Sequence, residues 1–118
     1  MPDAKWLSQV KRGLLELCIL NLVSRESTYG YQIVKRLTAV PGLEIPPGTI
    51  YPLLSRLKRE GLLTSVLVES LQGPARRTYT LTAAGRRHMR EINEAWREIA
   101  QAVMEFMDPQ AQREGGER

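Results

Sequence analysis

The feature that constrains the fold most is a pair of short amphipathic segments joined by a rigid connector. Thr28 can cap the start of the first segment, whose apolar residues follow helical spacing until Pro41 and Gly42 end it: Tyr29, Ile33, Val34 and Leu37. The connector, residues 44–48, contains two adjacent prolines. The second segment ends at Gly61 and has apolar residues at i, i+3, i+4 and i+7: Ile50, Leu53, Leu54 and Leu57. Two short helices with a tight connector predict a helix-turn-helix.

The flanking segments extend this motif on both sides. Residues 4–24 have helical apolar spacing, and the last two turns are apolar nearly all round, so we expect this helix at the centre of a core. Residues 62–71 and 76–81 are typical of two strands of a hairpin with residues 72–75 as its tip. Thr82 can cap a final helix that runs to about Met107. This order of elements predicts a mainly α (α+β) fold, a winged helix-turn-helix with a long helix appended.

We therefore expect three parts in the chain. Residues 1–81 form the winged helix-turn-helix, residues 82–107 a C-terminal dimerisation helix, and residues 108–118 a disordered tail. At 118 residues the chain is too short for two full-sized cores. Its longest uncharged apolar stretch falls far short of the roughly 20 residues that cross a bilayer. We expect a cytoplasmic protein with no membrane association.

Few residues of the chain are suited to metal or catalytic chemistry. The sequence has one cysteine, Cys18, and one histidine, His88, which excludes an intrachain disulfide, a cysteine zinc site and a histidine cluster. We expect Cys18 to be a buried apolar residue and His88 to lie on the solvated surface. The sequence shows no Ser-His-Asp arrangement, phosphate-binding glycine loop or carboxylate pair in a recognisable setting. We predict no metal, no cofactor and no enzymatic activity.

Positive charge is concentrated in the middle of the chain. The whole chain carries a net charge of +4, whereas residues 49–90 contain eight arginines and lysines against two glutamates, a net charge of +6. The remainder is slightly acidic, as expected when one surface faces phosphate. The alternative interpretation is a solvated basic face without a partner.

The outer face of the second short helix carries groups that can contact DNA: Thr49, Tyr51, Pro52, Ser55, Arg56, Lys58 and Arg59. In the major groove, arginine can bond guanine, and serine or threonine can bond either base edge. Lys58 and Arg59, near the end of the helix, are better placed to hold phosphate. An ordinary amphipathic helix does not predict Tyr51 beside Pro52, because the proline loses a backbone donor and the tyrosine is left exposed.

The hairpin adds a second basic feature. Arg76 and Arg77 follow the tip and, as neighbours on a strand, point to opposite faces, so at least one faces solvent. A wing beside the recognition helix can contact phosphate or an adjacent minor groove. Tyr79 either packs inward or bonds a phosphate.

The last helix has an apolar seam with spacings of 3, 4, 3, 4 and 3: Met89, Ile92, Trp96, Ile99, Val103 and Phe106. At 1.5 Å per residue, about 25 residues span roughly 38 Å, which outreaches a small winged helix. The seam can pack on the chain's own first helix. However, that helix is apolar on several sides, which favours pairing of both terminal helices across a two-fold axis. A homodimer predicts a palindromic operator with half-sites about 34 to 36 Å apart, or a multiple of that spacing.

Several motifs together resemble the PadR-like family of transcriptional regulators: YGYQI at 29–33, GTIYPLLSRL at 48–57, EGL at 60–62, RRTY at 76–79 and LTAAG at 81–85. The resemblance spans nearly the whole chain. It implies a dimeric winged-helix repressor with four residues facing the major groove, two near the DNA backbone and two on the wing: respectively Thr49, Tyr51, Ser55 and Arg56; Tyr29 and Tyr31; Arg76 and Arg77. The wing departs from the family pattern, since Thr78 precedes Tyr79 where a second aromatic is usual and Pro74 changes the tip.

The resemblance also implies an effector site. Small PadR-like regulators with a single C-terminal helix can hold flat hydrophobic effectors between paired tryptophans at the dimer centre, which gives Trp96 this role. Trp6 and Val10 of the first helix line the same space, and Leu14 joins them in the expected interface. The alternative is that Trp96 only fills the seam.

The leading hypothesis is a repressor that binds a palindromic double-stranded operator as a homodimer and is released by a hydrophobic or aromatic effector. Two alternatives stay open. The winged helix can serve as a protein–protein interaction module, or the chain can be a DNA-binding regulator without a small-molecule effector.

Overall fold

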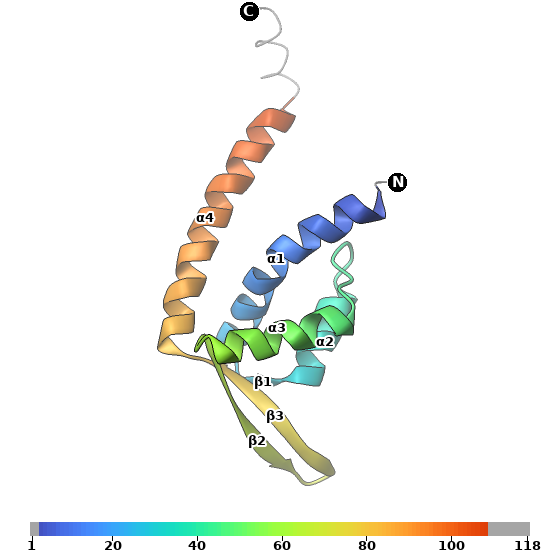
Figure 1. Cartoon of the computed structure of the whole chain (residues 1–118), viewed down its shortest axis with the longest axis vertical. Coiled ribbons are helices and arrows are strands. Elements are labelled where there is room, and N and C mark those ends of the chain that lie inside the picture. Colours follow the sequence, from blue (N-terminus) through green and yellow to red (C-terminus); the bar gives the residue numbers. More distant parts are fainter. Residues whose placement is uncertain (1–2, 109–118) are drawn as a thin grey trace, which may run out of the picture.

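The structure is a computed structural model that describes residues 3–108. The elements along the chain are α1 (Ala4–Arg25), β1 (Thr28–Tyr29), α2 (Gly30–Ala39), α3 (Pro47–Arg59), β2 (Leu63–Ser70), β3 (Gly73–Leu81) and α4 (Ala83–Met107). α4 extends away from the body in one direction, and the β2–β3 hairpin projects in the opposite direction (Figure 1). This is the winged helix-turn-helix that the sequence predicts. Apart from Asp108, the tail predicted at 108–118 lies outside the described residues.

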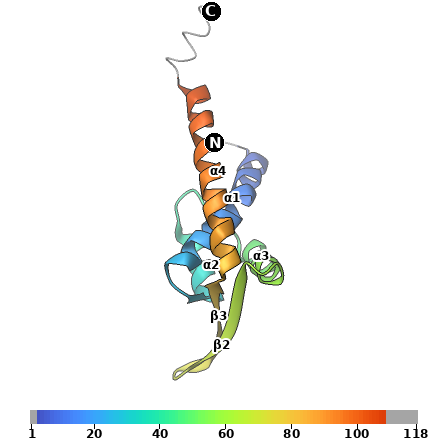
Figure 2. The same cartoon turned by 90° about the vertical axis from the view of Figure 1, so that its left-hand side faces the viewer.

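One apolar core holds the helices together. Its fully buried side chains come from α1, α2, α3 and the start of β2: Leu15, Ile19, Leu20, Ile33, Ile50, Leu54, Leu57 and Leu63. The predicted apolar spacing of α2 and α3 is confirmed, because three positions of each face this core. α3 therefore presents its opposite side to solvent, beside the hairpin (Figure 2).

Local sequence rules set several of the helix ends. The Asp3 carboxylate accepts a hydrogen bond from the Lys5 backbone N–H at the start of α1. Gly61 follows α3 with a φ of 78°, a left-handed conformation that glycine adopts without strain. Pro47, expected in the connector, is the first residue of α3. Its missing N–H removes no helical hydrogen bond at that position.

The sheet contains a strand that the sequence analysis missed. β1 pairs antiparallel with β3, Thr28 opposite Tyr79, and the strand order is β1-β3-β2. The expected cap at Thr28 is therefore wrong, because pairing with β3 holds Thr28 in an extended strand. α2 begins at Gly30, and its N-cap residue, Tyr29, makes no side-chain capping bond. The second strand of the hairpin is longer than predicted, because residues 73–75 belong to β3. The first strand is shorter than predicted and ends at Ser70, so the turn is at residues 71–72.

The junction between the hairpin and α4 is closely packed. The Thr82 hydroxyl accepts a hydrogen bond from the Gly85 N–H at 2.9 Å, which confirms the predicted cap. A Cβ on Gly85 would overlap the Leu62 carbonyl oxygen, so only glycine fits there. Of the helices in residues 3–108, none is long and apolar enough to cross a membrane.

Candidate nucleic-acid interface

The outward side of α3 is polar and accessible. Ile50, Leu54 and Leu57 point into the core, and the side away from them exposes Thr49, Tyr51, Pro52, Ser55, Lys58 and Arg59. Pro52 lies inside the helix, where it has no N–H to donate to the carbonyl of residue 48. Gly48 is exposed, so water can satisfy this carbonyl. The proline therefore leaves no buried carbonyl unsatisfied on the side of the helix that faces outward.

A second accessible surface adjoins this face of α3. The rings of Tyr29 and Tyr31 stack with centroids 6.4 Å apart, and the Arg76 guanidinium lies 4.4 Å from the Tyr29 centroid. Tyr51 and Arg77 line the same hollow of about 410 Å³. We call Tyr29, Tyr31, Tyr51, Arg76 and Arg77 the tyrosine–arginine surface. It joins β1, the start of α2, α3 and the wing, although these residues are up to 48 positions apart in the sequence.

Tyr79 is not part of the exposed surface. Its side chain is only 7% exposed and belongs to the core, so of the two roles considered for it the inward one is observed. Its place opposite Thr28 in the sheet turns the ring toward the start of α2. Tyr79 therefore supports the tyrosine–arginine surface from below and lines the same hollow, and its direct contact with DNA stays a prediction.

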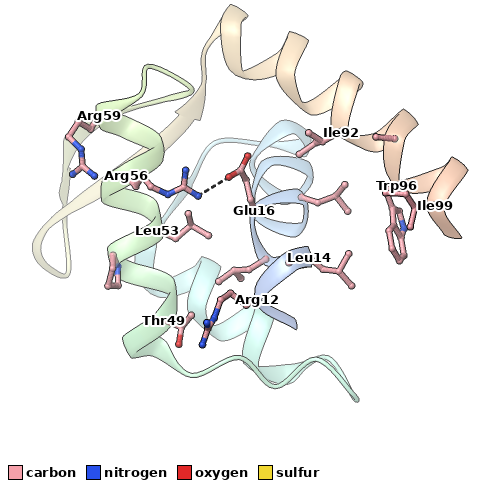
Figure 3. Close-up of a pocket in the computed structure, with 15 residues that line it drawn as sticks. Arg12, Leu14, Glu16, Thr49, Leu53, Arg56, Arg59, Ile92, Trp96 and Ile99 are labelled. Carbon is pink, nitrogen blue, oxygen red and sulfur yellow. Dashed lines mark hydrogen bonds and ion pairs between the residues drawn. The ribbon is translucent and has the colours of Figure 1, made fainter. Parts of the chain in front are cut away.

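Arg56 also departs from its expected place. Its Nη2 donates to Glu16 Oε1 of α1 at 2.8 Å, and its Nη1 donates to both carboxylate oxygens of Glu60 at 3.1 Å. The side chain points from α3 toward α1 (Figure 3). These two carboxylates raise the pKa of Arg56, first through the hydrogen bond to Glu16. Arg56 is thus held by two carboxylates of its own chain while its side chain is 42% exposed, and its contact with the major groove stays a prediction.

His88 is the third member of this group. Its Nε2 lies 2.6 Å from Glu16 Oε2, so His88 is not the solvated surface residue that the sequence predicts. Partial burial raises the pKa of Glu16, but hydrogen bonds from His88 and Arg56 outweigh that effect and the pKa lies below its usual value. Glu16 is therefore a carboxylate at neutral pH, in contact with both α3 and α4.

The predicted apolar seam of α4 divides into two parts. Met89 and Ile92 pack against the core, whereas the later seam residues are exposed: Trp96, Ile99, Val103 and Phe106. Of the first-helix residues expected beside them, Leu14 is half-buried, and Trp6 and Val10 are exposed. α1 and α4 diverge toward these ends (Figure 1). Trp96, Ile99 and Val103 therefore remain accessible in one protomer.

A groove of about 660 Å³ lies between α1, α3 and α4. Leu14, Ile92, Trp96 and Ile99 line it together with Leu53 of α3, and Arg12, Arg56 and Arg59 add positive charge (Figure 3). Trp6 and Val10 are not among its lining residues. The structure thus brings four of the predicted interface residues together in one protomer.

Comparison with known proteins gives this geometry its context. The model of the transcriptional regulator PadR-like family matches residues 19–91. The transcriptional regulator Rv3488 of Mycobacterium tuberculosis is 34% identical over 98 residues, which cover 83% of this chain and 90% of that protein. This chain belongs to the PadR-like family of transcriptional regulators.

Solved structures agree with the assignment. A PadR-like regulator from Bacillus cereus superposes with a TM-score of 0.77 at 33% identity, covering 85% of this chain and 97% of that one. A PadR family regulator from Eggerthella lenta has a TM-score of 0.77 at 31% identity, covering 90% and 92%. Members of the family are transcriptional regulators and not enzymes, which confirms the prediction that this PadR-like protein is not an enzyme.

Glu16, which lines the groove of this PadR-like regulator beside Arg56, is not among the residues that the sequence predicts. Glu16 is the one charged residue in the apolar run at positions 13–20 of α1, and its partners Arg56 and His88 lie 40 and 72 residues away. A charged residue among apolar positions on a core helix is the signal that could have indicated an ion pair, because a partly buried charge needs a partner. No local rule identifies which partner it finds.

Proposed function

We propose that this PadR-like regulator represses transcription by binding an inverted-repeat operator as a homodimer, and that a flat apolar effector at the dimer centre releases it. The observation that carries the proposal is the continuous exposed surface formed by α3 and the tyrosine–arginine surface. The buried apolar side of α3 fixes this helix to the core, so its polar side is presented outward as a rigid unit.

The chemistry of this surface favours duplex DNA. Thr49 and Ser55 on α3 can bond base edges, and Tyr51 can pack on a thymine methyl. Arg77 on the wing is exposed, with its Nη1 donating to Ser65 Oγ at 3.0 Å, and Lys58 is exposed at the end of α3. These cations are suited to phosphate contacts, which position the protein without reading sequence.

The homodimer is supported by the exposed apolar stripe on the second half of α4. α4 has 25 residues, which corresponds to about 38 Å, and its apolar residues after position 92 are exposed along one stripe. Exposed apolar seams of this kind are stabilised by a matching helix, and a second copy supplies an identical one. Two copies related by a two-fold axis present two recognition helices to one face of the duplex.

The effector proposal depends on Trp96. Its ring lines the groove between α1, α3 and α4 and is 39% exposed in one protomer. In a dimer built on α4, the two Trp96 rings lie near the two-fold axis and can enclose a planar apolar molecule. Such a ligand releases DNA only if it binds the DNA-incompetent arrangement more tightly than the competent one.

Footprinting of the DNA upstream of the regulator's own gene tests the operator proposal. We expect a protected inverted repeat, and a duplex with that repeat should bind far more tightly than a scrambled duplex of equal length. A duplex with one half-site should bind much more weakly than the full repeat. Equal affinity for all three duplexes would refute sequence-specific binding, and it would leave the protein–protein module as the better interpretation.

Tryptophan fluorescence tests the effector site. Planar aromatic compounds should quench the wild-type protein in a saturable way, and Trp96→Phe should remove most of the saturable signal. Trp6→Phe is the matched control, because Trp6 does not line the groove. Quenching that never saturates, or that survives in Trp96→Phe, would favour a regulator without this effector site.

A further inference from the structure

One carboxylate, that of Glu16, connects the recognition helix to the C-terminal helix. Its Oε1 accepts a hydrogen bond from Arg56 of α3 at 2.8 Å, and its Oε2 lies 2.6 Å from Nε2 of His88 of α4. Glu16 itself is on α1, and its side chain is 24% exposed. The two oxygens of a single group thus contact two different helices.

The attachment of α1 to α4 does not depend on Glu16 alone. Asn21 and Asn93 exchange two side-chain hydrogen bonds of 2.7 and 2.8 Å, and Asn21 also donates to the Leu17 carbonyl. This pair fixes α1 against α4 next to the Glu16–His88 contact. A change at Glu16 therefore leaves the α1–α4 junction in place and acts chiefly on the link to α3.

Arg56 has a second carboxylate partner that provides a natural comparison. Glu60 is on the same helical stretch as Arg56, in the i,i+4 relation, so the Arg56–Glu60 pair joins nothing beyond the end of α3. The Arg56–Glu16 pair joins α3 to α1. Both carboxylates contact the same guanidinium, but only Glu16 links separate elements.

We propose that Glu16 is a positioning residue that adjusts the orientation of α3 relative to α4 within the limits that the core packing of α3 allows. Through it, the arrangement of α4 in the dimer determines how the recognition helix is presented to DNA. The inference rests on the proposed function, because it concerns the same DNA-binding face. Neither Glu16 nor His88 needs to contact DNA for this role.

The expected effect is moderate because the ion pair is partly exposed. Loss of one such partly exposed ion pair changes the equilibrium constant between two arrangements of a protein by about threefold. Two protomers act on one operator, so Glu16→Gln should weaken operator binding by about tenfold. The change keeps the shape of the side chain and removes its charge.

The experiment compares Glu16→Gln, His88→Gln, the double variant and the control Glu60→Gln in the full-length protein. Fluorescence anisotropy gives each Kd for the footprinted operator and for a scrambled duplex. Glu16→Gln and Glu60→Gln add the same positive charge, so nonspecific binding should change equally in both. The ratio of scrambled to operator Kd should fall about tenfold in Glu16→Gln and stay within about twofold of wild type in Glu60→Gln.

His88→Gln distinguishes positioning through Glu16 from a general loss of stability. Because His88 acts through Glu16, His88→Gln should lower the same ratio, and the double variant should be no worse than Glu16→Gln alone. Urea unfolding identifies any loss of folded protein, and His88→Gln carries the test if Glu16→Gln does not fold. Additive effects, or equal ratios for Glu16→Gln and Glu60→Gln, would overturn the proposal. If wild type itself does not prefer the operator, the proposed function fails first, and this inference fails with it.

Discussion

Removing Arg77 from the wing should change how DNA binding depends on salt. The Arg77 side chain is exposed on β3, and its hydrogen bond to Ser65 lies within the hairpin. If each wing contacts one phosphate, a dimer loses two contacts in Arg77→Ala. Each phosphate contact contributes about 0.9 to the slope of log K against log salt, so the slope should become shallower by about 1.8.

The magnitude is large enough to measure. When salt rises from about 50 to about 200 mM, both proteins lose affinity for the operator. A slope shallower by 1.8 makes this loss about 12-fold smaller for Arg77→Ala than for wild type. Anisotropy titrations of the operator duplex at four or five salt concentrations give both slopes directly. Arg97→Ala is the matched control, because Arg97 is equally charged and exposed but lies on α4 beside Glu94. An Arg77→Ala slope equal to that of Arg97→Ala would refute the phosphate contact of the wing.

Three further predictions concern the core, the dimer and the Glu16 carboxylate. Leu54→Ala leaves a cavity at a fully buried position of α3, and it should lower the free energy of unfolding by about 2 to 5 kcal/mol in urea titrations. Val103→Lys should shift the dimer toward monomer in analytical ultracentrifugation because it places charge in the exposed seam, whereas Gln101→Lys, on another side of α4, should leave the dimer unchanged. Since the folded-state pKa of Glu16 is lowered, its contribution to stability is complete at neutral pH and is lost as the pH falls below its ordinary value of 4.5. The gap in urea midpoint between wild type and Glu16→Gln should therefore narrow as the pH falls below that value, and a gap that widens over this acidic range would contradict this account.

Sequence reasoning located the helices and the faces they bury. The apolar spacing of residues 50–57 defines the buried side of α3, and it therefore also defines the outward side that carries Thr49, Tyr51 and Ser55. The caps at Thr82 and the stop at Gly61 follow from side-chain and backbone preferences of single residues. Such features depend on interactions within about one helical turn, which is why a single sequence is enough to predict them.

The corrections share a different cause. Thr28 is extended because β3 pairs with it, and Tyr79 is buried because that same pairing turns its ring inward. Each of these two conformations depends on pairing between strands about 50 residues apart. The local sequence around Thr28 is compatible with a helix cap or a strand, and that around Tyr79 with an inward or an outward ring. The seam of α4 was predicted only in part from the sequence. Its spacing predicts an interface, but only the divergence of α1 and α4 in the structure shows that Trp96, Ile99 and Val103 stay accessible in one protomer.

The amino-acid sequence alone determined the order of elements, the buried faces and the basic character of the helix and wing, because periodicity and capping are short-range properties. Tertiary structure decided where the polar groups point. Arg56 is of the residue type, and at the helix position, expected to contact bases, yet it donates a hydrogen bond to Glu16, 40 residues earlier. His88, 72 residues after Glu16, contacts the same carboxylate. A charge pairs with whichever opposite charge the packed helices bring within hydrogen-bonding distance, and that distance exists only in the folded chain.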